Sequence, residues 1–70
     1  MNCNELKAAR IRRGISSKEL AQKLNWSAVK YSVKENGSRQ MSLNDAKKIS
    51  AALNLTPAEM LFIFFDIIIN

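Results

Sequence analysis

Apolar residues recur at intervals of three and four along most of the chain, the spacing that places side chains on one face of an α-helix. Polar residues and glycines that can begin or end a helix separate these stretches. The pattern predicts five short helices, over residues 3–13, 17–24, 28–35, 43–53 and 57–63. The fold class is therefore all-α, and residues 1–70 are expected to form a single domain.

The predicted helix starts carry side chains that can accept a hydrogen bond from a backbone amide. These candidate caps are Ser16, Ser27, Ser42 and Thr56. Ser16 and Thr56 each precede a glutamate by three residues, which is the spacing of a capping box. Gly14 and Asn25 stand where a left-handed residue is needed to end the first and second helices.

The most apolar stretch of the chain is its end, residues 61–69, which is interrupted by Asp66. It is far shorter than the roughly 20 residues that a membrane-spanning helix needs. Its β-branched and aromatic content predicts a short strand in the tail, residues 64–70, with Phe65, Ile67 and Ile69 on one face. We expect that face to pair with a second copy of the chain, because an exposed apolar strand is prone to aggregate. Alternatively, Leu61 and one or two of the phenylalanines simply close the core.

The net charge of the chain indicates which class of partner it attracts. The chain has 11 Lys and Arg against 6 Asp and Glu and no His, so its net charge is +5. Such a field attracts polyanions, either nucleic acid or an anionic membrane surface. Charge alone does not decide between them.

The sequence offers little for catalysis or metal binding. Without His, and with Cys3 as its one cysteine, it has neither an internal disulfide nor a cysteine-based zinc site. No nucleophile stands beside an obvious base, so we expect no enzyme activity, no catalytic residue, no metal and no cofactor. A lone reduced thiol favours a cytoplasmic setting.

The second and third predicted helices are joined by a tight turn over residues 24–27. This arrangement can project the second helix of the pair, about residues 27–35, into a major groove roughly 12 Å wide. Any small helical bundle can contain such a turn, so the turn is not by itself evidence of DNA binding.

Specific residues add a family resemblance over about residues 4–61. They are Leu6-Lys7, Arg10 and Arg13-Gly14-Ile15-Ser16, then Glu19-Leu20-Ala21 and Leu24, then Tyr31-Ser32 and Lys34-Glu35-Asn36-Gly37-Ser38-Arg39, with Ile49–Leu55 further on. In these motifs the chain resembles the Cro and phage-repressor type of helix-turn-helix domain, the XRE family. The resemblance implies a five-helix, lambda-repressor-like DNA-binding fold with the helix-turn-helix at the second and third helices.

The resemblance also implies roles for individual residues. Arg10 and Glu35 occupy the family's usual ion pair between the first helix and the end of the recognition helix. Ser17, where the family commonly has Gln, and Lys18 lie at a helix start suited to a DNA phosphate. Two further residues, Ser38 and Arg39, match positions that commonly touch the DNA backbone, whereas Lys7, Arg12, Lys47 and Lys48 are interpreted as solvated surface charge.

The base-reading positions depart from the family pattern. They hold Ala28, Val29, Lys30, Ser32 and Val33, where the family often has Gln, Arg, Ser or Asn. A valine cannot hydrogen-bond to a base, although it can pack on a thymine methyl group. We therefore expect affinity to come mainly from phosphates, with Lys30 and Ser32 as the polar readers. Alternatively, the valines extend the core or contact a protein partner.

These observations predict a transcriptional regulator of Cro or repressor type, phage-derived or bacterial, that binds double-stranded DNA as a homodimer. The chain lacks the second domain of larger phage repressors, which favours a Cro-like or minimal regulator. Two alternatives remain: a protein-interaction module on the same fold, such as an antirepressor or antitoxin, and a peripheral membrane binder. We favour the regulator and expect no membrane partner and no small-molecule ligand.

Overall fold

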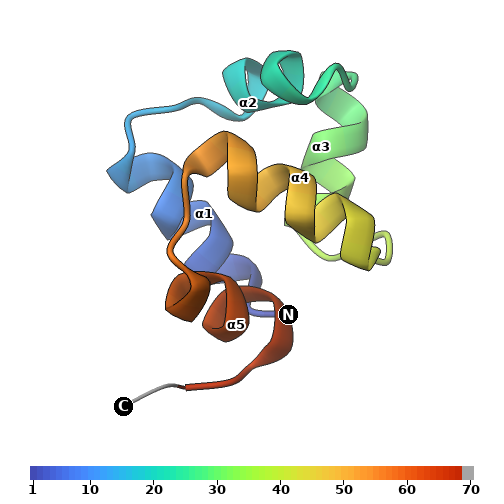
Figure 1. The fold of residues 1–70 in the computed structure, drawn as a ribbon. Coiled ribbons are helices and arrows are strands. Elements are labelled where there is room, and N and C mark those ends of the chain that lie inside the picture. The colour runs from blue at the N-terminus through green and yellow to red at the C-terminus, as the bar shows by residue number, and fades with distance from the viewer. Residues whose placement is uncertain (69–70) are drawn as a thin grey trace.

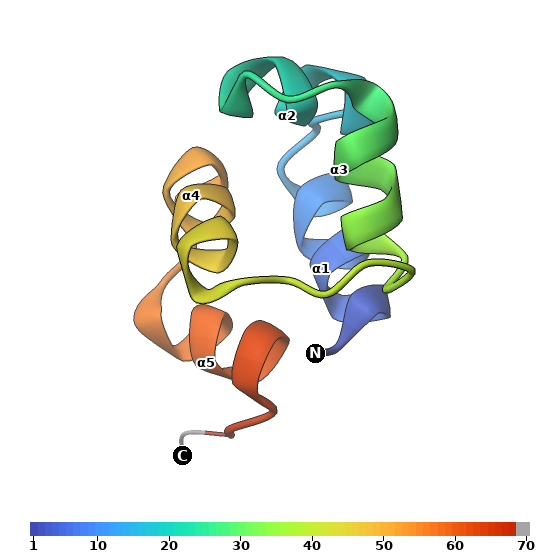
Figure 2. The ribbon, with the colours of Figure 1, turned by 90° about the vertical axis from the view of Figure 1, so that its right-hand side faces the viewer.

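A computed structural model describes residues 1–68 and contains five α-helices (Figure 1). They are α1 (Cys3–Arg12), α2 (Ser17–Leu24), α3 (Ala28–Glu35), α4 (Leu43–Leu53) and α5 (Pro57–Phe65). In the two ribbon views α2 lies at one end of the molecule and α5 at the other, with α1, α3 and α4 between them (Figures 1 and 2). The predicted all-α fold class is confirmed.

The polar caps that mark the helix starts in the sequence form the expected hydrogen bonds. The amides of Glu19, Lys30, Asp45 and Glu59 donate to the side-chain oxygens of Ser16, Ser27, Ser42 and Thr56, at 3.0 to 3.1 Å. Complete capping boxes begin α2, α4 and α5. Each cap satisfies an amide that the helix itself leaves unpaired, so the short helices have defined starts.

Left-handed residues end α1, α2 and α4, and after each of these helices the chain turns back toward the core. Gly14, Asn25 and Asn54 have φ of 68°, 59° and 57°. After each of them, the next amide donates to a carbonyl five residues earlier: Ile15 to Arg10, Trp26 to Ala21, and Leu55 to Ser50. Ile15, Trp26 and Leu55 then pack against the core, as the residue after such a cap commonly does.

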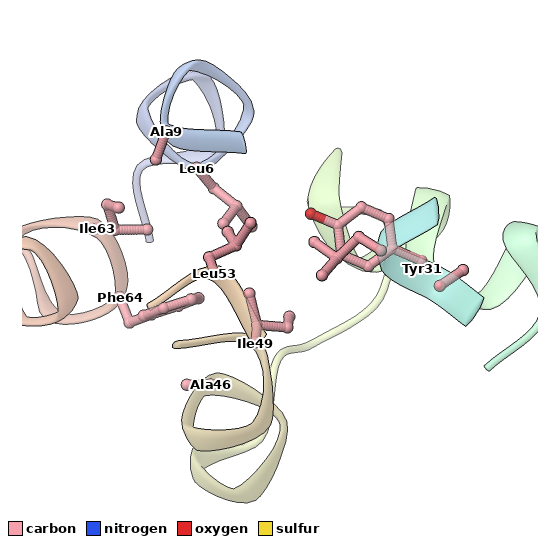
Figure 3. Close-up of a cluster of buried hydrophobic side chains, with 10 residues drawn as sticks. Leu6, Ala9, Tyr31, Ala46, Ile49, Leu53, Ile63 and Phe64 are labelled. Atoms are coloured by element: carbon pink, nitrogen blue, oxygen red, sulfur yellow. The ribbon is translucent and has the colours of Figure 1, made fainter. Parts of the chain in front are cut away.

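The core gathers one apolar stripe from each helix. Its buried members are Leu6, Ala9, Leu20, Ala21, Tyr31, Ala46, Ile49, Leu53, Ile63 and Phe64. In Figure 3, Ile49 and Leu53 of α4 lie between Tyr31 on one side and the α5 side chains on the other. Because α4 contributes to both sides, it joins the α2–α3 pair to α1 and α5.

The prediction for the tail is wrong where the structure describes it. We expected the last helix to end at residue 63 and a strand to follow, but Phe64 and Phe65 belong to α5 and Phe64 is 9% exposed. Burying a phenylalanine contributes about 2 to 3 kcal/mol, more than the roughly 1 kcal/mol range of strand preferences. The helix therefore continues far enough to bring Phe64 into the core.

Residues 66–68, which follow α5, are exposed, and two of them are isoleucines. Asp66 takes a left-handed conformation, with φ of 56°, and the Ile67 amide donates to the Leu61 carbonyl at 3.1 Å. The described tail residues, 66–68, form no strand, and Ile69 of the predicted apolar face lies outside the described residues. Within residues 1–68, no helix has the length and apolar character needed to cross a membrane.

Candidate nucleic-acid interface

The α3 helix presents most of its surface to solvent. Tyr31 is its buried residue, whereas Ala28, Val29 and Ser32 are exposed and Val33 is half-buried. Figure 2 shows α3 along one side of the molecule, with α2 across its start. The structure therefore leaves the predicted reading positions accessible, in the helix-turn-helix arrangement expected from the sequence.

An ion pair holds α3 against α1. Arg10 Nε donates to Glu35 Oε1 at 2.9 Å, and the two side chains are 9% and 12% exposed. Arg10 also donates to the Ile15 carbonyl at 2.8 Å, so one guanidinium joins α1, the turn after it and α3. The Tyr31 hydroxyl donates to the same Glu35 oxygen at 3.4 Å. Burial, and then the Glu35 charge, raise the pKa of Tyr31, which therefore stays protonated.

A polar hollow of about 410 Å³ lies beside α3. Besides the paired Arg10 and Glu35, it is lined by Cys3, Asn4, Lys7, Ser17, Ser32 and Asn36. It brings the start of α2 together with exposed side chains of α1 and α3. Lys7, interpreted from the sequence as solvated surface charge, is exposed and lines this hollow together with Ser17. Asn4 and Asn36 line it too, although the sequence analysis did not single them out.

The loop after α3 is held in a tight turn. The Ser38 amide donates to Asn36 Oδ1 at 2.9 Å, and the Arg39 amide donates to the Val33 carbonyl at 3.1 Å. Gly37 has a φ of 83°, and a Cβ there would lie 3.1 Å from the Cys3 sulfur. Glycine is therefore favoured both by the backbone conformation and by the close approach of α1. Ser38 and Arg39, the predicted backbone contacts, are both exposed on this turn.

The Lys30 side chain packs against the aromatic ring of Trp26. Its ammonium lies 4.4 Å from the centroid of the Trp26 ring, at the turn between α2 and α3. An exposed cation–π contact of this kind stabilises by about 0.5 to 1 kcal/mol. Lys30 must exchange this contact for one with a base if it is to act as the reader expected from the sequence.

Ion pairing leaves the excess positive charge at the surface. Three acidic side chains are paired with basic ones, in Arg10–Glu35, Arg13–Glu59 and Lys34–Asp45. The other basic side chains are exposed: Lys7, Arg12, Lys18, Lys23, Lys30, Arg39, Lys47 and Lys48. Lys7, Lys18, Lys30 and Arg39 belong to the hollow, the α2 start, α3 and its following loop, so positive charge borders the candidate interface.

A further apolar surface lies at the end of α5 and on the residues after it. Phe65, Ile67 and Ile68 are 42%, 48% and 71% exposed. Ile68 also lines a shallow apolar hollow of about 400 Å³ with Phe62 and Ala58. Two of the three residues predicted to form a dimer contact, Phe65 and Ile67, are thus accessible.

Comparison with known proteins agrees with this geometry. The sequence profile of a family described as helix-turn-helix matches residues 6–60. The match extends from α1 into α5, and it includes the Arg10–Glu35 pair, the α2–α3 turn and the loop after α3. No curated protein and no solved structure matches the chain.

Proposed function

We propose that this chain, which belongs to the helix-turn-helix family of DNA-binding domains, is a sequence-specific transcriptional regulator of Cro and repressor type. The observation that carries the proposal is the exposure of α3. This helix buries Tyr31, whereas Ala28, Val29 and Ser32 are exposed to solvent. A helix exposed in this way can enter the major groove, with α2 crossing the backbone beside it.

DNA phosphates are proposed to bind at two places beside α3. One is the start of α2, where the helix amides lie with Ser17 and Lys18, together with the polar hollow that Lys7 lines. The other is the turn after α3, where Ser38 and Arg39 are exposed. Contacts of this kind fix the position of the protein on the duplex and supply most of the salt-dependent affinity.

Base reading is proposed to combine apolar and polar contacts. Val29 is 72% exposed, so its methyl groups can pack on a thymine methyl group at little cost to the fold. Ala28 and Val33 extend this apolar surface. Ser32 offers a hydroxyl, and Lys30 becomes available once its ammonium leaves Trp26. The proposed site is therefore rich in A·T pairs.

Selection of bound sequences from random duplex DNA tests this function. We expect enrichment of one site in which thymines face α3, and binding that weakens steeply with added salt. The logarithm of the affinity should fall by about 0.9 for each phosphate contact per unit of log salt concentration. Enrichment of G·C-rich sites would contradict the proposed valine–thymine contacts, but it would not contradict DNA binding itself. Failure to retain any duplex, together with salt-independent binding to a protein, would support the interaction-module alternative instead.

Dimerisation is proposed to use the apolar surface of α5 and the residues after it. Two recognition helices reach half-sites about one DNA turn apart only when two copies associate. Replacing Phe65 and Ile67 together with Ser should shift the protein to a monomer in sedimentation experiments. Ile11→Ser removes a similarly exposed side chain, 57% exposed on α1, and should leave the dimer intact. An unchanged dimer in the double variant would place the contact elsewhere.

A further inference from the structure

Lys34, Asp45 and Trp26 form a cluster that joins α3, α4 and the turn before α3. Lys34 of α3 pairs with Asp45 of α4, with 2.5 Å between Nζ and Oδ2. The same ammonium lies 6.0 Å from the centroid of Trp26, in the turn before α3. The Lys34 and Asp45 side chains are 17% and 13% exposed, so the pair is largely withdrawn from solvent.

The Lys34–Asp45 pair also forms hydrogen bonds with the last part of the loop after α3. Lys34 Nζ donates to the Gln40 carbonyl at 3.3 Å, and Asp45 Oδ2 accepts from the Ser42 amide at 3.4 Å. One ammonium and one carboxylate oxygen therefore link α3, the last part of the loop and the start of α4. Burial raises the pKa of Asp45, but hydrogen bonds from Lys34 and Ser42 outweigh this and lower it, so the carboxylate is charged at neutral pH.

The rest of the loop has few interior contacts. Residues 36–40 are exposed and Met41 is half-buried against the core. The first part of the loop is tied to α3 through the bonds of Ser38 and Arg39 already described. Lys34 supplies the corresponding tie at Gln40.

We propose that Lys34 and Asp45 are positioning residues for DNA binding, which hold the loop so that Ser38 and Arg39 meet the DNA backbone. This inference rests on the proposed function, since it assumes that the loop contacts phosphate. The pair is neutral as a whole and does not itself attract DNA. It acts on binding through the arrangement of the loop.

A merely stabilising role predicts different behaviour. Removing one partner of a largely buried ion pair leaves the other charge unpaired and destabilises the fold, so each single variant is also expected to have a smaller folded fraction. Partial unfolding lowers the apparent affinity without changing how affinity varies with salt. Loss of a positioned phosphate contact reduces that salt dependence, because fewer counterions are released on binding.

Asp45→Asn provides the sharpest test, because general electrostatics and the positioning role predict opposite changes in DNA affinity. The variant keeps an oxygen for the Ser42 amide but loses the charge that holds Lys34, and it makes the protein more positive. General electrostatics therefore predicts tighter DNA binding. If the pair positions the loop, binding to a mixed-sequence duplex should weaken about eightfold at about 0.1 M salt, and the salt slope should fall by about 0.9.

Lys34→Met and a matched control complete the experiment. Lys34→Met should show the same weaker binding and smaller slope as Asp45→Asn. Lys48→Met removes an equal charge from the exposed surface of α4 and should leave the slope unchanged. Combining Lys34→Met with Arg39→Ala should weaken binding little beyond Arg39→Ala alone, since both changes remove the same contacts. Far-ultraviolet circular dichroism reports the folded fraction of each variant, since Trp26 itself lies beside the altered pair.

Each outcome decides one question. Equal or tighter binding by Asp45→Asn, or an unchanged salt slope in both variants, would overturn the positioning role while leaving the proposed function intact. If the unaltered protein binds no duplex with steep salt dependence, the proposed function itself fails, and the positioning role fails with it.

Discussion

Replacing Arg10 with Met is expected to destabilise the folded domain by about 3 to 5 kcal/mol. The change leaves the Glu35 carboxylate, 12% exposed, without its guanidinium partner. It also removes the hydrogen bond that Arg10 donates to the Ile15 carbonyl in the turn before α2. A domain of this length has a total stability of roughly 4 to 10 kcal/mol, so a large part of it depends on one side chain.

Urea unfolding followed by far-ultraviolet circular dichroism measures this effect. The matched variant replaces Arg10 with Met and Glu35 with Gln, which removes the unpaired charge and keeps an acceptor for the Tyr31 hydroxyl. We expect the double variant to recover at least half of the lost stability, because the penalty arises mainly from the isolated carboxylate. If the single and double variants are equally unstable, the loss comes from the Ile15 contact and from packing instead.

The helix starts were predictable because their signals are local. Ser16, Ser27, Ser42 and Thr56 each bond an amide three residues away, and no distant contact is needed to form that bond. The end of α5 was not predictable in the same way. A local preference favours a strand for residues rich in Phe and Ile, whereas the burial of Phe64 depends on side chains of other helices.

The candidate site shows the same division between local and distant contacts. The exposed positions of α3 follow from the helical spacing around Tyr31. The contacts of Lys30 with Trp26, of Lys34 with Asp45, and of Lys7 with the polar hollow depend on how the helices meet in space. A single sequence gives no sign that Lys34 lies beside α4, since any exposed helix can carry a lysine there.

Replacing Val29 with Glu is expected to abolish specific DNA binding and to leave the fold intact. Val29 is 72% exposed and is the second residue of α3, where a carboxylate is favoured by the helix dipole. Stability should therefore change by no more than about 0.5 kcal/mol. In the groove, the same carboxylate faces phosphates and base acceptors, and like charges in contact cost several kcal/mol. We expect affinity for the selected duplex to fall on the order of 100-fold or more.

The control separates contact at α3 from a general loss of positive charge. Ala51→Glu changes the net charge equally, on an exposed position of α4 beside Lys23 and Lys48. Both proteins should be titrated with the selected duplex at one salt concentration, after thermal unfolding has shown that each is folded. If long-range charge dominates, the two variants weaken binding alike, and α3 does not lie in the groove. A large loss confined to Val29→Glu places the centre of the interface on the apolar face of α3, because only there does the new carboxylate replace a contact with DNA.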